Sequence, residues 1–400
     1  MIAAAELARK FRRELFEVVL PFWEQHGIDH QHGGFLCSLD HAGSLVSDRK
    51  FHWFQGRGIW FYSYLYQHFG RDPRHLETAR RAMEFLLRHA PQPDGWWAEV
   101  LARDGSVLRP FQGDLYGMYF AVEGLAEYAA ASGEARPLET ALELFQKLWR
   151  EIHRNDFGPR EQGLWMVNLL IATRLLERWH PEGVAEICDE SLEAIVHRHY
   201  NPELGLNNER LSRDFSREPE EATKCVIGHS VECLWMVMDE ALRRGDGKLW
   251  ELAAERIRRH LDVGWDHVYG GAATAVNVGH PEYEWPVDHP VETGLEFHER
   301  GEYHYMKSFW AVNETQVATL PIFERTGAEW AARYFLLAEE ARERRFSLRP
   351  RGYPLYLLFT DRQFSFQPRT FRQDNYHLPR QLMFNLRVLE RMAPLSGGLP

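Results

Sequence analysis

The sequence predicts an all-α protein, an (α/α)6 barrel of six helical hairpins with short β-hairpins in the loops at one end. Two observations carry this prediction. Long segments place apolar residues at steps of three and four with charged residues between them, as amphipathic helices do. A Gly-rich, aromatic element recurs between them, and six such elements give a mean repeat of about 67 residues, enough for two helices and their connections.

The helical segments follow one another from the N-terminus onward. Residues 1–15 carry charges through their apolar positions, which predicts an amphipathic helix and not a signal peptide. Further segments with helical periodicity span residues 76–90, 115–133, 138–152, 167–180, 229–246 and 330–346. Several of these end in Gly or in a Gly-Asp pair, which is typical of helix C-termini.

The Gly-rich elements begin near residues 32, 94, 158, 204, 269 and 351. The first two share the order Gly, aromatic, short extended run, Asp and Gly, which predicts a small hairpin. An open solenoid is the alternative, but the degenerate repeats and long loops favour a closed barrel. The linker 271–303 lacks periodicity and is predicted to be an ordered lid or partner contact. No domain boundary is evident, so residues 1–400 are predicted to form a single catalytic domain.

Composition excludes several classes of protein. The net charge of −11, without a basic block, argues against a nucleic-acid or anionic-membrane partner. No apolar run approaches the roughly 18 residues that span a membrane. The 4 Cys residues show neither metal-ligand nor secreted-domain spacing, which indicates reduced thiols and a cytoplasmic protein. Aromatic residues make up 13% of the chain, which suits sugar binding as well as packing.

Two histidines stand at predicted helix starts. His229 and Glu232, in "GHSVECLWMV", lie three apart and share one helical face, where the carboxylate can orient the imidazole and raise its basicity. His377, in "DNYHLPRQLMF", immediately precedes an amphipathic helix whose N-terminus favours the neutral imidazole, a base. The plain alternatives are a helix-start His beside a solvated Glu and a capping His. A zinc site needs a third ligand, and no such motif occurs, so no metal is predicted.

A cation surrounded by rings is the third candidate. In "KFHWFQGRGIWF", Arg57 stands between two glycines among aromatic residues, where backbone and ligand approach closely. A guanidinium there can hold a developing oxyanion. The alternative is a structural cation–π contact with Trp53 or Trp60.

The segment "YHYMKSFWAVNET" supplies the last candidates. Lys307, Trp310 and Glu314 are predicted to lie on one helical face, with Trp310 as a platform for a sugar ring or, alternatively, as a core residue. No serine-nucleophile motif, phosphate loop or dinucleotide fingerprint competes with these groups.

These motifs together resemble the N-acylglucosamine 2-epimerase superfamily, which includes cellobiose and mannose 2-epimerases and related aldose–ketose isomerases. The resemblance covers nearly the whole chain. The blocks that carry it, in the family's order, are "HGGF" at 32, "KFHWFQGRGIWF" at 50, "FAVEGLAEYA" at 120, "GHSVE" at 228, "KSFW" at 307 and "YHLPR" at 376. It implies an (α/α)6 barrel, a sugar substrate, no cofactor and a homodimer.

The resemblance also implies roles for the candidates. His229 and His377 act as acid and base on opposite faces of C2 of the opened sugar, and Arg57 contacts the carbonyl and enediolate oxygens. Glu232 supports His229, while Trp53 and Trp310 pack near the sugar. Two expected substrate contacts depart from the family: Asn313 stands where a His often follows the Trp, and Asn168 replaces a His of the cellobiose-epimerase and mannose-isomerase branches.

Three functions remain open at this point. The leading hypothesis is a 2-epimerase of a free reducing sugar, of the N-acylglucosamine/mannosamine or glucose/mannose type. Return of the proton to C1 instead of C2 would make it an aldose–ketose isomerase on the same site. The rivals of another class are an (α/α)6 glycoside hydrolase, with carboxylates such as Asp114 and Glu209, and a non-catalytic sugar- or nucleotide-binding protein.

Overall fold

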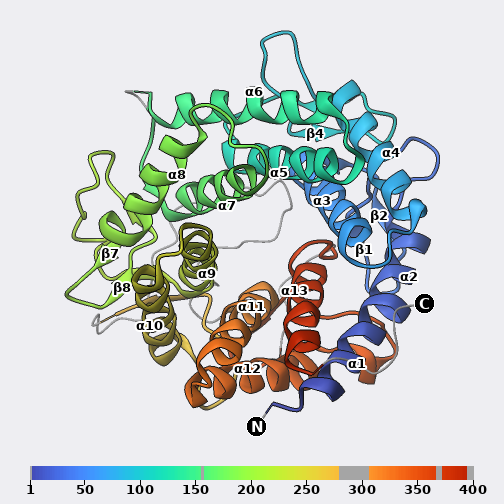
Figure 1. The fold of residues 1–400 in the computed structure, drawn as a ribbon. Helices are drawn as coiled ribbons and strands as arrows, with labels where there is room; N and C mark the ends of the chain where they lie inside the picture. Colours follow the sequence, from blue (N-terminus) through green and yellow to red (C-terminus); the bar gives the residue numbers. More distant parts are fainter. Residues whose placement is uncertain (1, 155–156, 279–305, 366–371, 394–400) are drawn as a thin grey trace. The chain divides into compact units, whose positions relative to one another are not determined.

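Figure 1 shows the computed structural model, which describes residues 2–154, 157–278, 306–365 and 372–393. Its contacts divide the chain into two compact units. The terminal unit comprises residues 4–155 and 371–400, and the central unit residues 1–3 and 156–370. The single catalytic domain stays a prediction, and residues 279–303 of the predicted lid lie outside the described residues.

The terminal unit is built from helical hairpins. Its helices are α1 (Ala4–Glu14), α2 (Leu20–Phe22), α3 (His52–His68), α4 (Pro73–His89), α5 (Leu115–Ser132), α6 (Ala135–Ile152) and α13 (His377–Met392), with π-helical turns at Leu15–Val19 and Trp23–Gly27. In Figure 1, α3 packs against α4 and α5, α5 against α6, and α1 against α13. α3 and α5 are buried nearly all round, whereas α4 and α6 bury one stripe, as expected for a covered helix paired with a solvent-facing one.

Two glycines let α3 and α5 approach each other closely. A Cβ atom on Gly56 would lie 2.2 Å from the backbone oxygen of Phe120, and one on Gly124 would lie 2.3 Å from the backbone oxygen of Gly56. Neither contact tolerates a side chain, so both positions require glycine. The same crossing places Phe120 beside Arg57, the residue after Gly56.

Short strands connect these helices. They are β1 (Ser38–Leu39), β2 (Leu45–Ser47), β3 (Lys50–Phe51), β4 (Val100–Leu101) and β5 (Val107–Arg109). β1 pairs with β2 and β4 with β5, both antiparallel, which confirms the two hairpins predicted from the Gly-rich elements. β3 pairs with β4 and runs directly into α3, so the strand pairing fixes where that helix begins.

The central unit repeats this construction. Its helices are α7 (Gln162–Arg178), α8 (Val184–Glu193), α9 (Ile227–Arg244), α10 (Gly247–Gly264), α11 (Phe309–Thr326) and α12 (Glu329–Ala341), with π-helical turns at Ala194–Arg198 and Arg342–Phe346 and a 3-10 turn at Arg349–Arg351. α7, α9 and α11 pack side by side, and each also contacts the helix that follows it in the chain.

Four antiparallel strand pairs lie between the helices of the central unit. The strands are β6 (Arg160–Glu161), β7 (Tyr200–Asn201), β8 (Leu206–Asn207), β9 (Arg210–Leu211), β10 (Lys224–Val226), β11 (Ala275–Asn277), β12 (Met306–Ser308) and β13 (Phe359–Asp361). β6 pairs with β9, β7 with β8, β10 with β11, and β12 with β13. α7, α9 and α11 each start at the residue after β6, β10 or β12, so strand pairing positions their first turns.

All four Cys side chains are buried and unpaired, as the sequence predicts. Across the described residues we find no helix with the length and apolar character of a membrane span.

Candidate active site

Arg57, in the second turn of α3, is enclosed by aromatic rings. Its guanidinium carbon lies 3.8 Å from the ring centre of Phe120, 4.7 Å from that of Tyr376 and 5.1 Å from that of Trp53. Its Nε is buried and has no hydrogen-bond partner within the described residues. Aromatic faces hold a cation without neutralising it, so this Arg57 cage keeps a positive charge available for an anionic oxygen.

A buried hydrogen-bond network fixes one wall of the Arg57 cage. The Tyr376 hydroxyl lies 2.9 and 2.8 Å from the two carboxylate oxygens of Glu123, and it accepts a hydrogen bond of 2.9 Å from Arg380. Burial raises the pKa of Glu123 to about 7, against the opposing influence of Arg380, Tyr376 and Arg57. The Tyr376 hydroxyl therefore lies against both carboxylate oxygens of Glu123 and donates its single proton to this carboxylate, a pairing that the sequence did not reveal.

His377 is the first residue of α13, as the sequence predicts, and it is half-buried. The Asp374 carboxylate accepts hydrogen bonds from the backbone N–H groups of Tyr376, His377 and Leu378, which closes the helix start. An Arg380 nitrogen lies 3.4 Å from His377 Nδ1. Since a guanidinium only donates, Nδ1 is the acceptor in this contact.

His229, the third residue of α9, is held by a carboxylate. Its Nδ1 lies 2.9 Å from Glu209 Oε1, and the two side chains are 28% and 15% exposed. Burial disfavours the charged ring, but the charge and hydrogen bond of Glu209 outweigh it and raise the pKa of His229 to about 9. His229 is therefore stabilised as an imidazolium.

Two further carboxylates act on His229 through their charge. Glu232 and Glu161 both help to raise the pKa of His229. Burial, followed by the charge of Glu209, raises the pKa of Glu161 itself. Glu209 accepts the hydrogen bond at His229 Nδ1, and Glu232 adds electrostatic support; that Glu232 also orients the ring stays a prediction.

Trp310 packs on His229, with ring centres 5.1 Å apart. Its six-membered ring also lies over Gly228, where an added Cβ would come within 2.4 Å of the indole. The glycine of "GHSVE" therefore makes room for the tryptophan of "KSFW". Trp310 is half-buried and also packs against Met306 and Leu358, so it combines a core contact with an accessible face.

The other predicted substrate contacts on α7 and α11 are buried. The Glu314 carboxylate accepts a hydrogen bond of 2.8 Å from Trp235 Nε1. Asn168 donates to the backbone oxygen of Leu164 in its own helix. Both polar atoms of the Asn313 amide are buried without a hydrogen-bond partner in the described part of the chain, so Asn313 retains unused hydrogen-bonding capacity. Substrate contact by these residues stays a prediction.

Lys307 does not share a helical face with Trp310 and Glu314, which corrects the sequence prediction. It lies in β12, before α11 begins, because its segment pairs with β13. Its side chain is 2% exposed, and its ammonium binds the Asp266 carboxylate at 3.0 Å and the backbone oxygen of Gly270. These partners favour a structural role for Lys307 over a substrate contact.

The carboxylates named for glycoside hydrolysis have other partners. Asp114 caps α5 by accepting a hydrogen bond of 2.8 Å from the Gly117 N–H, and Glu209 binds His229. These contacts give each carboxylate another role, and none of them indicates a general acid for hydrolysis. This weakens the hydrolase hypothesis.

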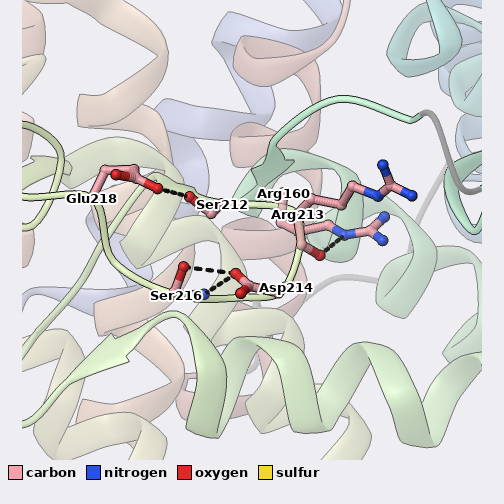
Figure 2. A pocket seen from close by; sticks show the side chains of 6 residues that line it. All are labelled: Arg160, Ser212, Arg213, Asp214, Ser216 and Glu218. Atoms are coloured by element: carbon pink, nitrogen blue, oxygen red, sulfur yellow. Dashed lines mark hydrogen bonds between the residues drawn. The ribbon is translucent and has the colours of Figure 1, made fainter.

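A separate surface pocket of about 430 Å³ lies in the central unit (Figure 2). Its lining residues are Arg160, Ser212, Arg213, Asp214, Ser216 and Glu218. Ser212 donates to Glu218, Ser216 donates to Asp214, and Arg160 donates to the backbone oxygen of Arg213. None of the predicted site residues lines this pocket, which is therefore distinct from the candidate active site.

The fold matches that of solved carbohydrate epimerases and isomerases. Cellobiose 2-epimerase from Bacillus thermoamylovorans superposes with a TM-score of 0.77 at 17% identity, covering 96% of this chain and 99% of that one. A D-mannose isomerase gives a TM-score of 0.74 at 14% identity, covering 98% and 99%. The predicted all-α (α/α)6 fold is thereby confirmed, and with it the fold class of these sugar-converting enzymes.

The family follows from the sequence itself. The model of the N-acylglucosamine 2-epimerase (GlcNAc 2-epimerase) family matches residues 33–287, and the chain belongs to this family. N-acylglucosamine 2-epimerase of Bos taurus is 28% identical over 420 residues, which cover 96% of this chain and 92% of that protein. The protein is therefore a carbohydrate epimerase of the isomerase class, as the sequence analysis predicted.

Proposed function

We propose that the enzyme inverts C2 of a free reducing sugar of the N-acylglucosamine/N-acylmannosamine or glucose/mannose type. The alignment with the bovine N-acylglucosamine 2-epimerase, which extends over almost the whole of both chains, supports this substrate class. Trp310, with an accessible indole beside His229, suits the apolar face of a sugar ring.

The reaction uses two imidazoles and one guanidinium. One histidine removes the C2 proton of the opened sugar, which leaves an enediolate with negative charge on oxygen. Arg57 stabilises that charge, and the other histidine returns a proton to the opposite face of C2. Histidine suits both steps because its ordinary pKa lies near working pH. The chemistry requires no metal and no redox cofactor.

The observation that carries this proposal is the Arg57 cage. A buried guanidinium is usually paired with a carboxylate, yet Arg57 packs on three rings. The carboxylate of Glu123 accepts its hydrogen bond from Tyr376, while Arg57 acts on it only through charge. A cation kept in this way suits a charge that forms only during turnover.

Proton NMR in D2O tests the reaction and the substrate together. The panel is glucose, mannose, N-acetylglucosamine, N-acetylmannosamine, cellobiose and fructose. We expect deuterium at C2 together with formation of the 2-epimer. Deuterium at C1 with a ketose product would assign aldose–ketose isomerisation to the same site, and release of monosaccharide from cellobiose would assign hydrolysis. No exchange with any sugar would contradict the proposal.

We further propose that the enzyme works in the cytoplasm as a homodimer. The family resemblance supports the dimer, and the four buried, unpaired thiols suit a reducing compartment. Sedimentation equilibrium that returned the monomer mass of 46.9 kDa at micromolar concentration would contradict the dimer.

A further inference from the structure

Glu209 stands in the connection between β8 and β9, and its backbone is fixed on both sides. Its carbonyl oxygen accepts a hydrogen bond of 2.8 Å from the N–H of Gln162, the first residue of α7. Its N–H donates to the oxygen of Lys224 in β10, the strand that leads into α9. The backbone that carries Glu209 is therefore tied to the helix start that carries His229.

The preceding asparagine strengthens this placement. Asn208 is fully buried and donates from Nδ2 to the backbone oxygens of Ala222 and Lys224 at 2.9 and 3.2 Å. Buried side-chain amides bonded to backbone in this way hold a loop in one conformation. Glu209 thus projects from a well-fixed backbone. A residue that orients another side chain needs such support.

The carboxylate itself faces His229. Oε1 contacts Nδ1 at 2.9 Å, while Oε2 is buried with no hydrogen-bond partner in the described ranges of the chain. A buried carboxylate with one bare oxygen is costly unless an adjacent group carries the opposite charge. The imidazolium form of His229 supplies that charge.

Among the described residues, three carboxylates from three different elements favour the charged form of His229. Glu209 comes from the β8–β9 connection, Glu161 from β6 and Glu232 from α9, while α11 contributes the uncharged ring of Trp310. Their combined effect raises the pKa of His229 to about 9. Since Nδ1 is bound to Glu209, Nε2 is the nitrogen left for the substrate.

We propose that Glu209 is a positioning residue of the reaction: it holds His229 through Nδ1 as an imidazolium, so that Nε2 starts the cycle as the proton donor to C2. This inference rests on the proposed function, because it assigns His229 its part in the two-histidine scheme. The opposite base takes the C2 proton, and the His229 Nε2–H bond breaks as the new C2–H bond forms. Exchange with solvent then restores the starting protonation.

The test compares Glu209→Gln with the wild type by NMR titration of ring-labelled histidine. The His229 signals are assigned from their loss in His229→Gln. Glutamine keeps an acceptor near Nδ1 but removes the charge, so we expect the pKa of His229 to fall from about 9 toward the ordinary value of about 6.5. The alkaline limb of the pH profile of kcat/KM should move to lower pH by the same amount. Glu203→Gln, an exposed Glu with the same charge change, should move neither.

The outcomes separate this role from the proposed function. If Glu209→Gln leaves both the titration and the alkaline limb unchanged, the positioning role is wrong even though the wild type still inverts C2. If the wild type places no deuterium at C2, the proposed function fails whatever the titration shows. Should Glu209→Gln not fold, Glu209→Asp serves instead: it keeps the charge on a shorter side chain, so the alkaline limb should stay near its place while kcat falls. An Asp variant with unchanged kcat would overturn the proposal.

Discussion

His229 and His377 both lie in the first turn of their helices, but their Nδ1 atoms contact side chains of opposite charge. Glu209 binds Nδ1 of His229, and Glu161 and Glu232 add negative charge. Arg380 contacts Nδ1 of His377 instead. The Glu209 carboxylate stabilises the charged imidazole of His229, whereas the Arg380 guanidinium donates to Nδ1 of His377.

Further charged groups lie near each of the two helix starts. The helix start of α13 carries charges of both signs: Arg380 binds Tyr376, and Asp374 accepts hydrogen bonds from the first backbone N–H groups. Burial together with the charge of Arg57 lowers the pKa of Arg372 to about 10. The central unit gathers carboxylates around His229. The comparison teaches that one residue type meets different partners at two helix starts, which is the kind of difference that the proposed acid and base require.

The largest expected effect comes from removing either ring. His229→Ala and His377→Ala should each lower epimerisation by about 10²–10⁴-fold, the usual contribution of a general acid or base. Each variant should still exchange the C2 hydrogen of one epimer with D2O, because the remaining imidazole reaches one face of C2. The exchanging epimer should differ between the two variants. Full activity in either variant, or exchange of the same epimer in both, would contradict the comparison.

The next largest effect concerns the cation. Arg57→Lys keeps a positive charge but loses the flat guanidinium that fits between Phe120 and Tyr376. We expect kcat to fall by about 10²–10³-fold, as for loss of an oxyanion-stabilising donor. Arg387→Lys, an exposed position on α13, is the matched control and should retain activity. Equal kcat for the Arg57 variant and its control would mean that the cage is only structural.

A smaller effect is expected from the wall of the cage. Tyr376→Phe keeps the ring over Arg57 but removes the hydroxyl that joins Glu123 to Arg380. Loss of a hydrogen bond to a charged group costs roughly 1.5–3 kcal/mol, so we expect kcat to fall by about 10- to 100-fold. Tyr334→Phe removes a hydroxyl bound to Asp262 in the central unit and should leave kcat unchanged. Turnover in Tyr376→Phe equal to that of this control would exclude the network from catalysis.

The sequence located the groups that stand at helix starts. Arg57, His229 and His377 follow from glycine, aromatic and helix-start patterns within a few residues of each, and the structure places all three near the beginning of a helix. Helical periodicity also showed that Glu232 and His229 share a face. Such patterns report neighbours along one element, which is the information that a period of 3.6 contains.

The partners from other elements were not predictable in the same way. Glu209 reaches His229 from the connection between the two-residue strands β8 and β9, and Glu123 reaches Tyr376 across 253 positions of the sequence. Lys307 appeared helical because its spacing matched, yet strand pairing with β13 determined its conformation. A strand of two or three residues is too short to show the alternation of apolar and polar residues that predicts a strand. The contacts that such strands bring about are therefore seen only in the structure.

The smallest expected effect concerns the pH dependence of the stability of the fold. The pKa of His229 is raised to about 9 in the folded protein, above the value of about 6.5 in an unfolded chain. The pair with Glu209 therefore stabilises the fold fully below about pH 6.5 and loses this contribution as the pH rises through about 9. Glu209→Gln removes most of it, so the melting temperature should depend less on pH between 6.5 and 9.5 than in the wild type. Differential scanning fluorimetry measures both curves, with Glu203→Gln as the control. Parallel curves for all three proteins would show that the carboxylate near His229 does not hold a proton on the ring.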